Sequence, residues 1–136
     1  MPSDLTVLVA DDEEDILYIA AKRITGAGFQ VVKASDGDQA VAYLHAALPD
    51  IAVLDVNMPG KDGFEVLKEL RKLTPSGKWI PVIIVSGRTE LADMRRGYDL
   101  EADHYLTKPC SMEEVVGAVR LMATLIPLRV SSRPAV

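Results

Sequence analysis

The chain has 136 residues, of which 49% are hydrophobic and 26% charged, and its formal net charge is −5 at pH 7. This length fits one domain with a real core, and the composition excludes a disordered or fibrous chain. The acidic balance argues against direct nucleic-acid binding. A single cysteine, Cys110, excludes an internal disulfide, and no apolar run approaches the roughly 20 residues of a membrane span. We therefore expect a soluble, cytoplasmic domain with no membrane contact.

Apolar runs of strand length recur five times along the chain. They are built mainly from Val, Ile, Leu and Ala, while aromatic residues make up only 5% of the sequence. This usage is typical of a parallel sheet covered by helices. The predicted strands are residues 5–10, 30–34, 50–55, 81–85 and 103–107.

Between these runs, apolar residues recur at spacings of three and four, which predicts helices. The acidic residues 11–15 open the first helix, where negative charge suits the positive end of the helix dipole. Pro127 is expected to end the last helix. The predicted helical positions are Ile16, Ala20, Ile24 and Ala27; then Ala40, Val41 and Leu44; then Phe64, Leu67, Leu70 and Leu73; then Leu91, Met94 and Tyr98 in a weaker helix; and finally Val115, Val119, Met122 and Ile126.

Strands that alternate with helices five times predict an α/β fold, in which parallel strands joined by right-handed crossovers form a doubly wound sheet. Ligands of such sheets bind beyond the carboxyl ends of the strands. Polar residues interrupt the apolar runs at this edge. Asp11 and Asp12 follow the first strand and Asp55 ends the third, while Ser86 follows the fourth strand and Lys108 the fifth.

The convergence of three carboxylates at one edge has an electrostatic cost. Two like charges about 4 Å apart repel by roughly 4 kcal/mol at an effective dielectric of 20. Either the carboxyl pKa values therefore rise, or a cation sits among Asp11, Asp12 and Asp55. All candidate ligands are oxygens, which favours a hard cation, and Mg²⁺ is the natural choice if the substrate carries a phosphate. Lys108 and Ser86 would then face an anion. These residue types predict a phosphoryl-transfer site with Asp55 as the nucleophile.

The same residues resemble the motifs of the CheY-like receiver domains of two-component response regulators. The resemblance covers about residues 5–126 and implies a flavodoxin-like (βα)5 fold with strand order 2-1-3-4-5. It places the receiver domain at residues 1–126, with 127–136 as a tail or the start of a linker. The matching motifs are Asp11-Asp12, Asp55 followed by Met58-Pro59-Gly60 and Asp62-Gly63, Ser86-Gly87, and Ala102-Asp103-His104-Tyr105-Leu106 leading into Lys108-Pro109.

The resemblance implies a role for each matching residue. Asp55 would accept a phosphoryl group from a phosphohistidine of a sensor kinase or a histidine phosphotransfer protein. Asp11, Asp12 and Asp55 would hold Mg²⁺ through their side chains, and Asn57 would add its backbone carbonyl. Lys108 would pair with the phosphoryl group.

The remaining matches concern the switch and the lifetime of the modified state. Ser86 would bond to a phosphoryl oxygen, and Tyr105 matches the family's switch aromatic, which turns from exposed towards buried on activation. Asn57 and Arg88 match positions that tune self-dephosphorylation. The family also implies a cis peptide bond between Lys108 and Pro109. The surface formed by the fourth helix, fifth strand and last helix would be read by a downstream protein or output domain.

One residue departs from the pattern. Many family members carry an aromatic residue after the Lys-Pro pair, and here it is Cys110, which puts the packing at the start of the last helix in question. Considered apart from the resemblance, Cys110 is interpreted as a small buried hydrophobic residue.

The expected function is a regulatory phosphoacceptor with slow self-dephosphorylation, not an enzyme. Two other classes remain open: a metal-dependent phosphohydrolase that uses the same aspartates, and an interaction module that is never phosphorylated. A stand-alone regulator and a piece of a larger regulator or hybrid kinase both fit the sequence.

Overall fold

The computed structural model describes residues 4–87, 95–96 and 102–131. In this part of the chain five parallel strands form one sheet in the order β2-β1-β3-β4-β5, which confirms the predicted fold class. The strands are β1 (Thr6–Ala10), β2 (Gln30–Ala34), β3 (Ile51–Asp55), β4 (Val82–Ser86) and β5 (His104–Thr107). The helices are α1 (Glu14–Gly26), α2 (Gly37–Ala46), α3 (Gly63–Leu73) and α5 (Met112–Ser131).

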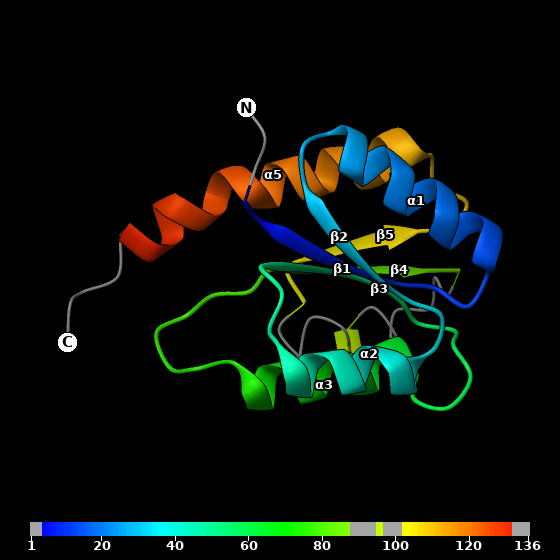
Figure 1. The fold of residues 1–136 in the computed structure, drawn as a ribbon, viewed down its shortest axis with the longest axis horizontal. Helices are drawn as coiled ribbons and strands as arrows, with labels where there is room; N and C mark the ends of the chain where they lie inside the picture. The colour runs from blue at the N-terminus through cyan, green and yellow to red at the C-terminus, as the bar shows by residue number, and fades with distance from the viewer. Residues whose placement is uncertain (1–3, 88–94, 97–101, 132–136) are drawn as a thin grey trace.

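The molecule has three layers. Helices α1 and α5 cover one face of the sheet, and α2 and α3 cover the other (Figure 1). Side chains alternate between the two faces along each strand. In β1, Val7 and Val9 therefore pack towards α1 and α5, while Leu8 and Ala10 pack towards α2 and α3. The central strands β3 and β4 are buried along their whole length, which is why they read as continuous apolar runs in the sequence.

Local sequence signals fix where the helices begin. Asp36 caps α2 by accepting a hydrogen bond from the backbone N–H of Gln39. Asp62 and Glu65 form a reciprocal capping box at the start of α3, directly after the loop that follows Asp55. The loop between β3 and α3 is thus anchored at its far end by a stable helix terminus.

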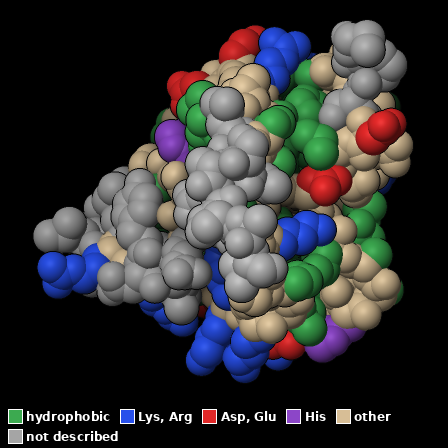
Figure 2. Space-filling model, turned by 90° about the vertical axis from the view of Figure 1, so that its left-hand side faces the viewer, with side chains coloured by type: hydrophobic (Ala, Val, Ile, Leu, Met, Phe, Trp, Pro, Cys, Tyr) green, Lys and Arg blue, Asp and Glu red, His purple; other side chains and the backbone are tan. Residues whose placement is uncertain are grey.

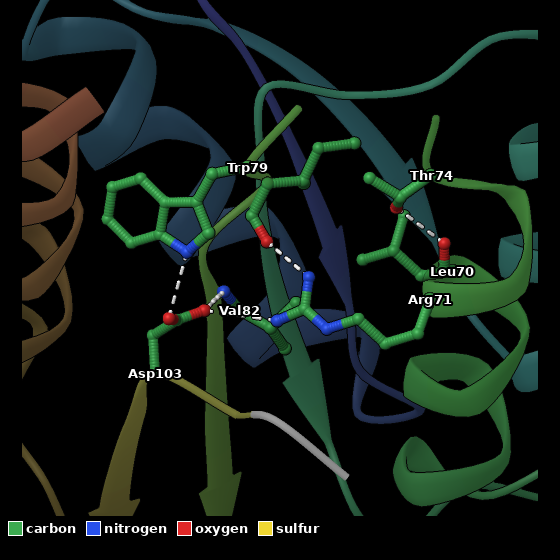
Figure 3. A network of polar contacts seen from close by, with 7 residues as sticks. Leu70, Arg71, Thr74, Trp79, Val82 and Asp103 are labelled. Carbon is green, nitrogen blue, oxygen red and sulfur yellow. Dashed lines mark hydrogen bonds and ion pairs between the residues drawn. The ribbon is translucent and has the colours of Figure 1, made fainter. Parts of the chain in front are cut away.

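A polar network ties together the amino ends of β4 and β5, at the edge of the sheet opposite the strands' carboxyl ends (Figure 3). Asp103 accepts hydrogen bonds from the indole N–H of Trp79 at 3.0 Å and from the backbone N–H of Val82 at 2.8 Å. Its carboxylate also pairs with Arg71 of α3 at 3.1 Å, and Arg71 donates to the carbonyl of Ile80 at 2.7 Å. Trp79 thus packs in the core and also donates a specific hydrogen bond.

This end of the molecule faces the viewer in Figure 2, where hydrophobic side chains lie among charged side chains of both signs. The single-sign acidic cluster predicted from the sequence belongs to the other end of the strands.

The expectation that Pro127 ends the last helix is wrong, because α5 continues through Pro127 to Ser131. Proline removes its own backbone N–H and the bond that this group would donate, and its ring crowds the carbonyl four residues earlier, but these effects are local. The N–H groups of the next four residues keep the carbonyls of residues 124–127 as partners. In addition, Leu125 and Ile126 pack against the core beneath α1 and α5, which holds the turn before Pro127 in place.

The weaker helix predicted around Leu91, Met94 and Tyr98 lies outside the described residues, apart from residues 95 and 96, which are helical. The guanidinium of Arg96 lies 4.9 Å from the centre of the Phe64 ring. Among the described helices, none has both the length and the apolar content needed to cross a bilayer.

Candidate functional site

The register of the sheet brings the acidic residues together at its carboxyl edge. Ala10 of β1 pairs with Leu54 of β3, so the next residue on each strand, Asp11 and Asp55, comes to the same level. One oxygen from each of Asp11, Asp12 and Asp55 lies within 4.8 Å of the others. Asp11 and Asp55 are buried, with 6% and 3% of their surface exposed, whereas Asp12 is exposed. The cluster therefore has a buried base and one ligand at its rim.

Lys108 reaches into this cluster from the end of β5. Its Nζ lies 3.4 Å from Asp55 Oδ2 and 3.5 Å from Asp11 Oδ2. The backbone N–H of Lys108 donates to the carbonyl of Ser86 at 2.8 Å, which fixes where the side chain begins. The Lys108–Pro109 peptide bond is cis, as the resemblance implied.

The electrostatics of Asp55 show that its charge is incompletely compensated. Burial and, after it, the neighbouring Asp11 carboxylate raise the pKa of Asp55 from its ordinary 3.8 to a net value of about 6, although Lys108 and the backbone N–H of Asn57 act in the opposite direction. For Lys108, burial lowers the pKa, but the carboxylates of Asp55 and Asp11 outweigh it and the net pKa is raised. One lysine stays charged here without neutralising all the carboxylates around it.

The loop after Asp55 folds closely back on the end of β3. The N–H groups of Met58 and Gly63 both donate to the carbonyl of Val56, at 3.2 and 3.1 Å. The N–H of Asn57 points to Asp55 Oδ1 at 3.3 Å. A Cβ on Gly63 would lie 2.4 Å from the backbone oxygen of Asp55, so this approach requires glycine. The Pro59-Gly60 and Asp62-Gly63 signals thus produce the tight loop that they predict.

The other predicted residues are placed as follows. Ser86 is fully buried at the end of β4, and Tyr105 is 8% exposed and packs on the α2 and α3 side of the sheet. Tyr105 is therefore already buried in this structure. The side chain of Asn57 is exposed. Arg88 lies outside the described residues, so its predicted part in dephosphorylation has no structural counterpart here.

The sequence reasoning missed Glu13 as a member of the site. Its Oε1 lies 3.9 Å from Lys108 Nζ, which makes it a third carboxylate around the same ammonium. In the sequence Glu13 stands beside the Asp11-Asp12 pair, within the acidic run that predicts the start of the first helix. Adjacency to that pair is the signal that could have identified it.

The donor set fits a hard divalent cation. Asp11, Asp12 and Asp55 each offer a carboxylate oxygen, and neither histidine lies among them. Oxygen-only clusters of this kind match the ligand preference of Mg²⁺. The raised pKa of Asp55 has burial as its main cause and the Asp11 carboxylate as its second, and a cation among the carboxylates would lower it again.

Sequence and structure comparisons place the chain among known proteins. It is 38% identical over 114 residues to the probable transcriptional regulator ycf27 of Guillardia theta, covering 84% of this chain and 43% of that protein. It is also 38% identical to the alkaline phosphatase synthesis transcriptional regulatory protein PhoP of Bacillus subtilis, over 84% of this chain and 46% of PhoP. The chain thus spans about half the length of the curated relatives it matches.

Solved structures agree with this. The receiver domain of the Francisella response regulator 1452 superposes with a TM-score of 0.80 at 32% identity, over 89% of this chain and 98% of that one. The chemotaxis protein CheY4 of Vibrio cholerae gives a TM-score of 0.80 at 28% identity, over 88% and 99% of the two chains. The response regulator receiver domain family matches residues 7–120. The chain therefore belongs to the receiver domains of two-component response regulators.

Proposed function

We propose that Asp55 accepts a phosphoryl group from a phosphohistidine of a sensor kinase or histidine phosphotransfer protein, in a Mg²⁺-dependent reaction. The observation that carries the proposal is the meeting of Asp11, Asp12 and Asp55 within 4.8 Å, with Lys108 Nζ 3.4 Å from Asp55. A carboxylate nucleophile, a hard-cation site and an ammonium are the parts that phosphoryl transfer needs.

In the proposed reaction, a carboxylate oxygen of Asp55 forms a bond to phosphorus as the bond between phosphorus and the donor's imidazole nitrogen breaks. That nitrogen keeps the electron pair. The side chains of Asp11, Asp12 and Asp55, with the backbone carbonyl of Asn57, would hold Mg²⁺, which when bound offsets the negative charge on the phosphoryl oxygens. Asp55 must be ionised to attack, and a cation among the carboxylates favours this form because it lowers the carboxyl pKa.

Lys108 and Ser86 would recognise the product. In the unmodified chain Lys108 divides its charge between Asp55 and Asp11. After transfer, its ammonium would turn to a phosphoryl oxygen. Ser86 stands at the end of the neighbouring strand, and its hydroxyl would donate to another phosphoryl oxygen, drawing in the loop that follows.

Tyr105 and the surface around β5 would carry the signal onward. Tyr105 lies on β5, the four-residue strand that ends directly before Lys108, so movement at Lys108 would be passed along β5 to the aromatic ring. We propose that the readout face is formed by β5, by α5 and by the predicted fourth helix, which precedes β5 in the chain. Asn57 and Arg88 would set the rate of self-dephosphorylation.

We also propose that the output lies outside residues 1–126, which we take as the receiver domain. Its relatives are named transcriptional regulators and are about twice its length, so a separate domain or protein would contact DNA. The net charge of −5 argues against nucleic-acid binding by this domain itself, and we propose that it works in the cytoplasm.

The direct test is to incubate the protein with a small acyl phosphate and Mg²⁺ and to locate the added phosphoryl group by mass spectrometry. Labelling on Asp55 that is lost with a chelator and in Asp55→Asn is the expected result. Asp62→Asn is the matched control, because it removes a nearby carboxylate while keeping a good helix cap, and it should label normally.

Two outcomes would replace the proposal. Steady turnover of a phosphate ester with no stable Asp55 adduct would favour the metal-dependent phosphohydrolase. Failure to label, together with failure to bind Mg²⁺, would favour an interaction module that is never phosphorylated.

A further inference from the structure

A cavity of about 450 Å³ opens beside Asp55, between the sheet, α1 and the start of α5. This volume lies within the roughly 300–1,000 Å³ range of small-molecule pockets. Its floor is formed by Val9, Val53 and Val85 on three adjacent strands, and each of these is less than 7% exposed. The cavity therefore reaches down to the sheet itself.

The walls explain why the space is not filled. Ala20 on α1 faces the cavity with a single methyl group, and Cys110 borders it from the start of α5. Cys110 is the position where many family members carry an aromatic residue, and the doubt raised there about packing is answered by a cavity. The thiol is partly buried, and its pKa is raised, chiefly by burial, so it presents an uncharged surface.

The mouth of the cavity carries an excess of negative charge. Among the described residues that line it, Asp11, Glu13 and Asp55 carry negative charge and Lys108 carries positive charge. Lys108 Nζ lies 3.4 to 3.9 Å from a carboxylate oxygen of each. One ammonium cannot balance three carboxylates, and Glu13, whose side chain is 65% exposed, remains accessible to a further positive group.

We propose that this pocket binds a small amphipathic cation, with an apolar group in the cavity and an ammonium against the carboxylates at its mouth. The apolar floor supplies the driving force, and the charge at the rim selects the sign of the ligand. A neutral or anionic molecule of the same shape would gain the burial of its apolar group but would lack the attraction to the carboxylates.

The position of the site also predicts coupling to the metal. Asp11 and Asp55 border both the cavity mouth and the carboxylate cluster, so a ligand ammonium and a divalent cation draw on the same two charges. Each should weaken the binding of the other by the same factor. The pocket is a way for a small molecule to lower the metal occupancy of the switch.

The test uses the metal-free chain, so it does not depend on phosphorylation. Benzylammonium is the probe, and benzyl alcohol and methylammonium report the apolar and cationic parts alone. In titrations followed by amide NMR, benzylammonium is expected to bind about tenfold more tightly than either, with shifts at Val9, Val53 and Val85. Saturating Mg²⁺ should weaken it by about fivefold or more.

Cys110→Phe should fill the cavity and weaken benzylammonium binding by about tenfold, while leaving the affinity for Mg²⁺ unchanged. Cys110→Ala is the matched control and should bind the probe like the wild type. Ala20→Leu narrows the cavity from the opposite wall and provides a second test if Cys110→Phe does not fold.

Several results would overturn the inference. Equal binding of benzyl alcohol and benzylammonium would remove the role of the carboxylates. Undiminished binding in both Cys110→Phe and Ala20→Leu would place the probe elsewhere, and no measurable binding to the wild type would end the proposal. Failure of Asp55 to label with an acyl phosphate would leave this proposal standing, because the two experiments read different properties.

Discussion

Replacing Asp55 with asparagine should make the metal-free protein more stable at neutral pH. The carboxyl is buried, with 4% of its side chain exposed, and its pKa is about 6 in the folded chain against an ordinary value of 3.8. An acid with a raised folded-state pKa holds its proton more tightly when folded. Between pH 3.8 and about 6 the folded chain therefore binds more protons than the unfolded chain, so stability falls as the pH rises through this window.

The magnitude follows from the same two values. The gap between 3.8 and about 6, at about 1.36 kcal/mol per pH unit, amounts to about 3 kcal/mol. Above pH 6 the wild type carries this whole penalty. Asparagine has no charge to bury. About 1 kcal/mol of the penalty is already present at pH 4.5, so the variant's advantage in free energy of unfolding should grow by about 2 kcal/mol between pH 4.5 and pH 7.

Urea denaturation followed by circular dichroism, in the presence of a chelator and at several pH values, measures this difference. Asp15→Asn serves as the control for loss of one exposed acidic charge in the first turn of α1. Adding Mg²⁺ at pH 7 should shrink the variant's advantage, because a ligand that binds the folded wild type stabilises it. A difference between wild type and Asp55→Asn that stays flat with pH would refute the reasoning.

Three further substitutions test the framework around the site. Asp103→Ala removes the acceptor at the centre of the amino-end network and should lower the free energy of unfolding by about 2–4 kcal/mol, seen in urea titrations, without changing Mg²⁺ affinity by calorimetry. Gly63→Ala places a methyl group 2.4 Å from the carbonyl oxygen of Asp55; it should cost about 1–3 kcal/mol and also weaken Mg²⁺ binding. Asp62→Ala deletes the α3 capping box and should cost about 1 kcal/mol in the same denaturation assay.

Each substitution has an informative partner. Gly26→Ala adds a methyl group with no atom within 4 Å and should be tolerated, so an equal loss in both glycine variants would argue against crowding at Asp55. Asp62→Asn should retain most of the cap. An Asp103→Ala protein that unfolds like the wild type would show that the network contributes no net stability.

The residues at the carboxyl edge of the sheet could be predicted from the sequence because one rule of parallel sheets determines where they lie. Parallel strands end on the same side, so a polar residue that follows each apolar run must arrive at that edge. The register then sets the finer alignment, and the pairing of Ala10 with Leu54 brings Asp11 level with Asp55. The sequence specifies the edge, whereas the distances depend on how the strands pair.

Other features depend on contacts that no local pattern reports. Asp103 contacts Trp79 and Arg71, which lie 24 and 32 residues away in the sequence. No local sequence pattern around Asp103 predicts these two contacts. Glu13 belongs to the site because of its ion pair with Lys108, which comes from a segment far away in the sequence. For Pro127 the local rule was applied too strongly, since one missing N–H does not outweigh the intact bonds on either side.

The Asp103 network has a mechanical consequence for β5. Among the described strands, β5 lies at the sheet edge and pairs with β4 alone. Its amino end is tied to α3, to β4 and to the segment before β4 through one carboxylate, whereas its carboxyl end is held by Lys108, through a backbone bond to Ser86 and through ion pairs with the acidic cluster. The first anchor does not depend on the charge at Asp55, whereas the ion pairs of the second anchor do. When the charge at Asp55 changes, we therefore expect β5 to pivot about its amino end, with a displacement that grows along the strand towards Lys108 instead of a slip in register.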